Sequence, residues 1–180
     1  MSTARSDLIT HLRGHALRTD GPFTLSSGAT AEWYLDARQT TFSGGGARAV
    51  AAAVLSVVPN EVAAVGGMTM GADPIAVAAA VCSEGRLDAF SIRKTAKGHG
   101  TGGRLVGPVA PGMAVTVLED TTTTGAALAE AIEVAREHGL DVVQAVSLVD
   151  RSGNRVAGLM AELSVSYVAL VTPADLGVEP

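Results

Sequence analysis

Short apolar segments alternate with helix-like segments along most of this chain, and the alternation limits its fold more than any other feature. The apolar segments are rich in Val, Ala and Leu and lie at residues 61–67, 87–93, 113–119, 141–150 and 165–171. Segments with helical patterning lie at residues 6–19, 44–58, 72–85, 126–139 and 156–163. Short apolar strands of this kind are typical of a parallel sheet covered on both faces. We therefore predict an α/β fold with a central, mostly parallel sheet flanked by helices.

Length and composition fit one domain over residues 1–180, because 47% of the residues are hydrophobic and can fill one core. The net charge of −5 argues against a protein that coats nucleic acid or lies on a membrane. No apolar run is long enough for a membrane span or a signal peptide. Cys82 is the only cysteine, so no internal disulfide can form, and a cytoplasmic location fits. Cys82 lies on an Ala-rich helix and is expected in the core.

The stretch VTVLEDTTTTGAAL, residues 115–128, joins a predicted strand to a predicted helix through acids, hydroxyls and a glycine. Ligands of parallel sheets bind at the carboxyl ends of the strands, where Glu119 and Asp120 are expected. A helix start offers unpaired backbone N–H groups and partial positive charge, which suit a phosphate. Glu119 and Asp120 are placed to accept hydrogen bonds from a diol. The pattern therefore predicts a site for a ribose with a 5′-phosphate.

The same residues have a simpler interpretation, in which a threonine caps the helix and the acids favour its dipole. Two familiar phosphate motifs are absent from this stretch. It does not contain the dinucleotide fingerprint G-x-G-x-x-G, and no Gly-Lys-Thr follows its loop as in a Walker motif.

A second stretch, SIRKTAKGHGTGGRLVG at residues 91–107, gathers cations among glycines. It holds the only two lysines of the chain, Lys94 and Lys97, together with Arg93, His99 and Arg104. A flexible cationic loop beside a phosphate site indicates a mobile lid over a polyanion, here residues 93–107. The alternative is a solvated surface loop whose charge is incidental.

These stretches resemble the orotate phosphoribosyltransferases, a subfamily of the type I phosphoribosyltransferases. VTVLEDTTTTGAAL is similar to the motif that binds 5-phosphoribosyl-1-diphosphate (PRPP), and RKTAKGHGTGG is similar to the catalytic loop. FTLSSGATAEWYLDAR resembles the N-terminal hood, which would occupy roughly residues 1–40. VGGMTMGADPIAVAAA resembles the diphosphate-binding turn and its helix, and SLVDRSGN the strand end that carries an arginine for orotate.

The resemblance implies transfer of the 5-phosphoribosyl group from PRPP to N1 of orotate, giving orotidine 5′-monophosphate and diphosphate. It also implies Mg²⁺, held mainly by substrate and water, and a homodimer whose loop reaches the partner's site. In the family, the counterparts of Arg93, Lys97 and His99 reach the partner subunit's ligand, while that of Lys94 serves its own. Two alternatives share the fold: a phosphoribosyltransferase for another base, and a non-catalytic nucleotide-sensing regulator.

The resemblance also implies a role for individual residues. The catalytic residues would be Lys97, His99 and Asp120. The PRPP-binding residues would be Arg93, Lys94, Lys97, His99, Glu119, Asp120, Thr121, Thr122, Thr123, Thr124, Gly125, Ala126 and Ala127. The orotate-binding residues would be Ser26, Tyr34, Leu35, Thr123 and Arg151. The chain departs from many relatives at Ser26, where they carry lysine, and at Met70, where they carry a basic residue.

Overall fold

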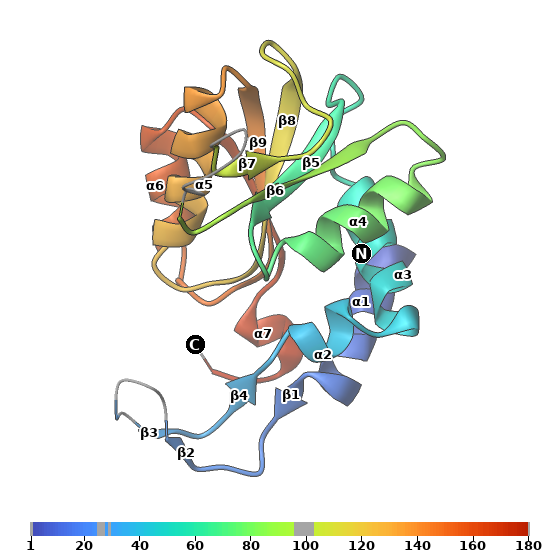
Figure 1. The fold of residues 1–180 in the computed structure, drawn as a ribbon. Coiled ribbons are helices and arrows are strands. Elements are labelled where there is room, and N and C mark those ends of the chain that lie inside the picture. The colour runs from blue at the N-terminus through green and yellow to red at the C-terminus, as the bar shows by residue number, and fades with distance from the viewer. Residues whose placement is uncertain (1, 25–27, 29, 96–102, 180) are drawn as a thin grey trace.

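The computed structural model describes residues 2–24, 28, 30–95 and 103–179. Its centre is a six-stranded sheet in the order β10-β9-β8-β5-β6-β7 (Figure 1). These strands are β5 (Ala64–Met68), β6 (Asp88–Ile92), β7 (Leu105–Val106), β8 (Ala114–Thr122), β9 (Asp141–Asp150) and β10 (Ser166–Val171). The first five strands in the spatial order are parallel, and β7 is antiparallel to β6 at the edge. The predicted fold class is confirmed.

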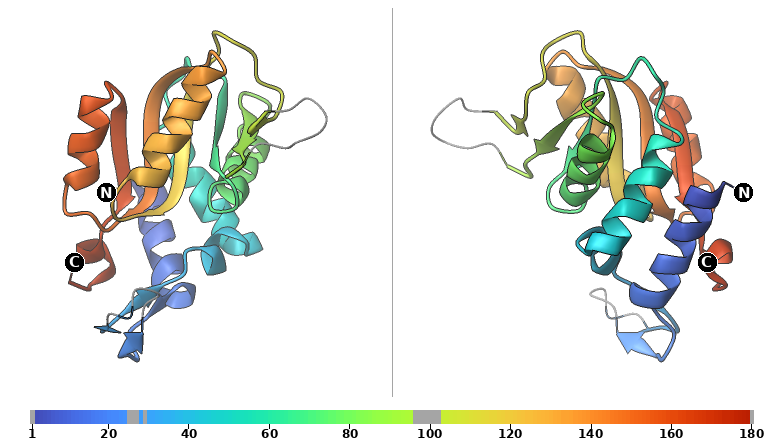
Figure 2. Two further views of the ribbon diagram at one scale, coloured as in Figure 1. Left: turned by 60° about the vertical axis from the view of Figure 1, so that its left-hand side comes forward. Right: turned by 90° about the vertical axis from the view of Figure 1, so that its right-hand side faces the viewer.

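Helices cover both faces of the sheet (Figure 2). One face carries α1 (Thr3–His15), α3 (Gly44–Leu55) and α4 (Asp73–Cys82), whose buried side chains share one apolar cluster. The other face carries α5 (Ala126–Glu137) and α6 (Arg155–Glu162), which enclose a second cluster. The central strands β5, β8 and β9 bury most of their residues because both faces are covered. This frame fixes the carboxyl ends of β5, β6, β8 and β9.

A small two-part hood lies beyond the carboxyl ends of the strands (Figure 1). Two strand pairs form it, both antiparallel: β1 (Leu17–Arg18) with β4 (Tyr34–Leu35), and β2 (Phe23–Thr24) with β3 (Thr30–Ala31). The short helix α2 (Arg38–Thr41) then leads back into α3. The hairpin or hood expected from the sequence is present. The strands of the hood lie within residues 17–35, whereas α1 packs into the main core.

Four short elements were not predicted, namely β1, α2, β7 and α7 (Pro173–Leu176). The helix predicted over residues 6–19 ends at His15, and β1 follows it. The last residues of the chain also join the fold, because Pro173 and Leu176 are buried. Thr172 and Asp175 form a capping box at the start of α7, and Arg5 of α1 pairs with Asp175 at 2.6 Å. The expected burial of Cys82 is wrong, since it lies exposed at the end of α4.

Candidate active site

Glu119 and Asp120 lie within β8, near its carboxyl end, rather than beyond the strand. Glu119 keeps only 8% of its surface exposed, and Asp120 is partly exposed. The backbone N–H of Thr121 donates to Asp120 Oδ1 at 2.6 Å, which fixes that carboxylate. Gly71 lies so close that a Cβ there would be 2.8 Å from Asp120 Oδ1. The turn after β5, which contains Gly71, therefore packs directly against the acidic pair.

Glu119 is held in an unusual protonation state. Burial, and then the neighbouring charge of Asp120, raise the pKa of Glu119 to about 8. Within the described residues, its Oε2 atom is buried and has no hydrogen-bond partner. Burying an oxygen without a hydrogen-bond partner costs free energy of folding unless a ligand supplies that partner. Glu119 therefore offers a neutral carboxyl group at pH 7 that can both donate and accept a hydrogen bond.

The threonine run divides between strand and loop. Thr121 and Thr122 belong to β8, where Thr122 is buried, so the strand continues beyond the apolar segment 113–119 and the loop begins later than predicted. Thr123 and Thr124 are exposed, and Gly125 has a φ of 82°, a left-handed conformation that favours glycine. The N–H of Ala126 donates to Thr124 Oγ1 at 3.3 Å. This turn leaves the start of the twelve-residue helix α5 open to an anion.

A cleft of about 860 Å³ opens beside the acidic pair. Its lining comes from the ends of β5, β6 and β8, from α5 and from the start of α2. The lining residues are Arg38, Met68, Thr69, Met70, Gly71, Arg93, Lys94, Thr95, Glu119, Asp120, Ala127 and Glu130. The predicted residues that the structure brings together here are Arg93, Lys94, Glu119, Asp120 and Ala127. Cations therefore face carboxylates across a space large enough for a phosphorylated sugar.

The two ends of the cationic loop are tied together. Arg93 N–H donates to the carbonyl of Arg104 at 2.8 Å, and Arg104 Nε donates back to the carbonyl of Arg93 at 2.8 Å. The Arg104 guanidinium also pairs with Glu130 on α5. The loop therefore leaves the sheet at a fixed place beside the cleft. The predicted residues Ser26, Lys97 and His99 lie outside the described residues.

Sequence reasoning missed several lining residues. Arg38 closes the hood motif, and its pKa is raised mainly by a hydrogen bond to Asp36, with a smaller effect from Asp120. Thr69 donates to Asp73 Oδ2 at 2.5 Å, which ties the turn after β5 to the start of α4. Arg38 could have been found as the cation that ends the quoted hood stretch. Thr69 carried no comparable signal.

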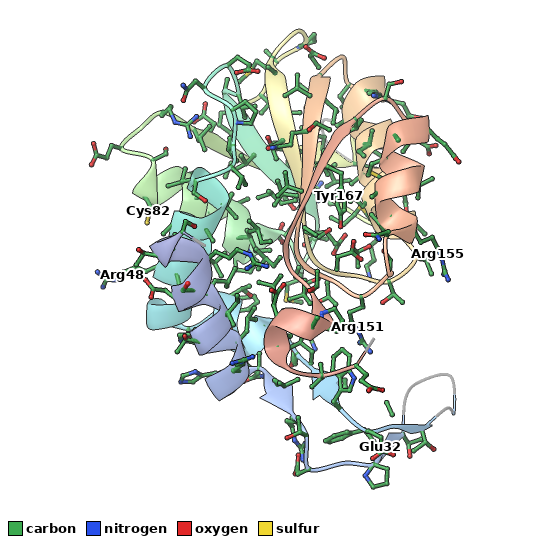
Figure 3. The ribbon with its side chains drawn as sticks, turned by 180° about the vertical axis from the view of Figure 1, so that it is seen from behind. Glu32, Arg48, Cys82, Arg151, Arg155 and Tyr167 are labelled. Carbon is green, nitrogen blue, oxygen red and sulfur yellow. The ribbon has the colours of Figure 1, made fainter. Side chains whose placement is uncertain are left out.

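Arg151 occupies a different cavity from the acidic pair. Its backbone N–H donates to the carbonyl of Thr122 at 2.8 Å, which fixes its backbone beside the turn that precedes α5. Its side chain lines a cavity of about 630 Å³ with Trp33, Glu32 and Glu179. Figure 3 shows Arg151 between α7 and the hood.

The two hood residues expected at the base pocket differ in their surroundings. Tyr34 is 38% exposed, and its ring centroid lies 6.0 Å from that of Phe23. The Leu35 side chain is buried in the main core instead. The Tyr34 side chain is therefore accessible, whereas Leu35 anchors the hood.

The parallel sheet, the acidic pair at the end of β8 and the hydroxyl-rich turn before α5 define a type I phosphoribosyltransferase. A Streptomyces coelicolor orotate phosphoribosyltransferase is 39% identical over 183 residues, which cover 99% of this chain and 100% of that protein. The chain belongs to the orotate phosphoribosyltransferase family. It is thus an enzyme of pyrimidine biosynthesis that transfers the phosphoribosyl group of PRPP to orotate.

Solved structures agree with this assignment. The Mycobacterium tuberculosis orotate phosphoribosyltransferase in complex with Fe(III) dicitrate has a TM-score of 0.84 and 32% identity, covering 97% of this chain and 99% of that one. The same enzyme in complex with PRPP has a TM-score of 0.80 and 28% identity, with the same coverage. No family model matches the chain.

Two features are absent from the described residues. No helix within them is both long and apolar enough to cross a bilayer. No cluster of three or more His, Cys, Asp or Glu side chains in that part of the chain is arranged to hold a metal ion.

Proposed function

We propose that PRPP lies along the cleft from the turn before α5 to the ends of β5 and β6. Its 5-phosphate would contact the loop of residues 121–127, whose exposed hydroxyls and helix start support this placement. Its ribose hydroxyls would meet Glu119 and Asp120, and its diphosphate would face Arg93 and Lys94. The observation that carries the proposal is the single cleft in which these cations face the acidic pair.

Catalysis in this arrangement is mainly positioning and electrostatic stabilisation. The bond from ribose C1 to diphosphate breaks with negative charge growing on the diphosphate, and N1 of orotate bonds to C1. Lys97 and His99 are proposed to meet the departing diphosphate, and Asp120 to hold the ribose. The fixed ends of the loop at Arg93 and Arg104 support delivery of these side chains to a cleft.

The cleft suits a Mg²⁺ ion bound with PRPP. The carboxylate of Asp120 offers oxygen ligands of the kind that Mg²⁺ prefers. When bound, the ion would neutralise charge on the diphosphate, held mainly by substrate and water. The protein itself would contribute the acidic pair, which would hold the ribose hydroxyls.

Orotate is proposed to lie between the hood and the end of β9. Arg151 would pair with its carboxylate, a contact that the fork of a guanidinium makes with two hydrogen bonds. Tyr34 would cover the base, with Thr123, Leu35 and Ser26 nearby. The hydrogen bond from Arg151 N–H to Thr122 supports this placement, because it sets the base next to the phosphate loop.

We also propose that the chain acts as one domain over residues 1–180, in the cytoplasm, and as a homodimer whose loop 93–107 reaches the partner's site. An apolar surface on α2 and α4 supports the dimer, because Phe42 is 60%, Val77 55% and Val81 75% exposed. Met70 of the cleft wall is also exposed, at 59%. Charging this surface by Val81→Asp should yield monomers in size-exclusion chromatography. Ala157→Asp adds the same charge on α6, across the sheet, and should leave the dimer intact.

The function itself is tested by substrate choice. The enzyme should consume orotate, followed by its absorbance near 295 nm, only with both PRPP and Mg²⁺ present. Adenine and hypoxanthine, tested with PRPP under the same conditions, should not be converted. Asp120→Asn should lower turnover while Glu137→Gln, an exposed change on α5, should not. Turnover of a purine instead of orotate would contradict the proposed base, and no turnover of any base would favour a regulator.

A further inference from the structure

The guanidinium of Arg151 lies over an aromatic ring that comes from the hood. Its Cζ atom is 4.2 Å from the centroid of the Trp33 indole ring. Such a contact attracts a cation to the negative face of the ring, and indole is the strongest of the aromatic partners. The hood thus touches the arginine at the end of β9.

The N–H donors of this guanidinium have no protein partner among the described residues. The five N–H groups of arginine point outward in the plane of the group. Within residues 2–24, 28, 30–95 and 103–179, no acidic side chain forms an ion pair with Arg151 and its guanidinium donates no hydrogen bond. A planar carboxylate could therefore take two of these donors without displacing a protein partner.

The C-terminal residues hold the indole ring of Trp33 in place. Trp33 Nε1–H donates to the carbonyl of Glu179 at 2.9 Å, and both Trp33 and Val178 pack against the main core. These residues follow α7, which is secured by its capping box and by the ion pair between Arg5 and Asp175. Trp33 is therefore held by the residues that follow α7 as well as by its own place in the hood.

The backbone of Arg151 is fixed independently of its side chain. Its N–H donates to Thr122, and the preceding Asp150 accepts hydrogen bonds from the N–H of Ser152 at 2.7 Å and from Tyr167 Oη at 3.0 Å. Burial lowers the pKa of Arg151, so its surroundings disfavour the charge slightly. The aromatic face opposes that effect and selects one direction for a long, flexible side chain.

We propose that Trp33 is a positioning residue: it holds the Arg151 guanidinium with its edge open for the carboxylate of orotate, without contacting orotate itself. The proposal rests on the proposed role of Arg151 and adds the residue that orients it. Trp33 should therefore affect the affinity for orotate and leave the affinity for PRPP unchanged.

Steady-state kinetics of three variants test this role. Trp33→Leu removes the aromatic face and should raise the KM for orotate about fivefold, equivalent to about 1 kcal/mol, with the KM for PRPP unchanged. Trp33→Phe keeps a ring and should raise it less than twofold. Asp20→Asn breaks an exposed ion pair with Arg18 in the hood and should leave both constants unchanged. Equal effects of Trp33→Leu and Asp20→Asn would mean general loosening of the hood and would overturn the proposal.

A double-mutant cycle separates this proposal from the role of Arg151. In an Arg151→Ala background, Trp33→Leu should have no further effect on the KM for orotate, because nothing remains to be oriented. If the two effects add instead, Trp33 acts elsewhere and the proposal is wrong. If Arg151→Ala alone leaves the KM for orotate unchanged, the proposed base contact fails, and the role of Trp33 fails with it.

A spectroscopic readout is available because Trp33 is the only tryptophan in the chain. Protein labelled with 5-fluorotryptophan should give one ¹⁹F resonance, from the ring that contacts Arg151. Orotidine 5′-monophosphate should shift this resonance, and the shift should be lost in Arg151→Ala under saturating ligand. An unchanged resonance in the parent protein, or the same shift in both proteins, would show that the indole does not sense the arginine.

Discussion

Glu119→Gln should make the protein more stable at neutral pH, by an amount that grows with pH. The pKa of Glu119 is about 8 in the folded protein and 4.5 in a free side chain, so the folded state holds a proton that the unfolded state releases between these values. A group with a raised folded pKa contributes its full stability only below about pH 4.5, and loses it as the pH rises towards 8. Glutamine has the shape of the neutral acid and does not ionise.

The size of the effect follows from the two pKa values. The unfolding free energy of the parent should fall by about 1.4 kcal/mol per pH unit in the middle of this range, relative to the variant. Between pH 5 and pH 7 the advantage of Glu119→Gln should grow by about 2.5 kcal/mol. That is a large part of the 5–15 kcal/mol typical of a folded protein's total stability.

Urea unfolding followed by circular dichroism at pH 5, 6, 7 and 8, without substrates, measures this difference. Glu137→Gln removes an exposed carboxylate from α5 and serves as the control for a change of surface charge. Asp120→Asn removes the neighbouring charge that helps to raise the pKa of Glu119, so it should weaken the pH dependence of the parent. If Glu119→Gln and the parent differ by the same amount at every pH, Glu119 is ionised throughout and the argument is refuted.

Three further predictions concern the bound substrates. Gly125→Val should weaken PRPP binding, measured by calorimetry, and also lower the melting temperature, because a Cβ at this φ of 82° would lie 3.1 Å from Val156 rather than only crowd the phosphate. Arg151→Ala should raise the KM for orotate about ten- to a hundredfold and that for PRPP little, and equal effects would refute the base contact. Lys97→Ala and Asp120→Asn should each be nearly inactive, yet mixing them should restore up to about a quarter of parental activity if the loop acts across a dimer. No recovery after subunit exchange would place the loop in its own subunit.

The sheet and its main helices could be predicted because their signals are local. Val, Leu and Ala fill β8 and β9, and the glycines at Gly125 and Gly139 adopt the positive φ that ends one element and begins the next. The acidic pair followed directly from its place at a strand end. Arg93 and Lys94 line the cleft around it as expected, because neighbouring parallel strands end at the same edge of the sheet.

The missed features depend on contacts between distant residues. Nothing near Trp33 in the sequence indicates that its ring would meet Arg151, because the two meet only after the hood and the C-terminal residues have packed. The burial of Glu119 depends in the same way on the walls around it, so its raised pKa had no local signal. Cys82 was misplaced because an Ala-rich helix of this kind has no strongly polar face to show which side is solvent.

The proposed site spans the extremes of local stability in this protein. β8 and β9 are nine and ten residues long, buried, and paired with neighbours on both sides, so their amides should exchange with solvent only in rare, nearly global openings. The strands of the hood are two residues each and are paired on one side only, so they should open by local fraying. Glu119 and Asp120 thus lie on the slowest-exchanging part of the chain, and Tyr34 on one of the fastest. The ribose would bind a surface that is already ordered, whereas orotate would have to order the hood residues that cover it.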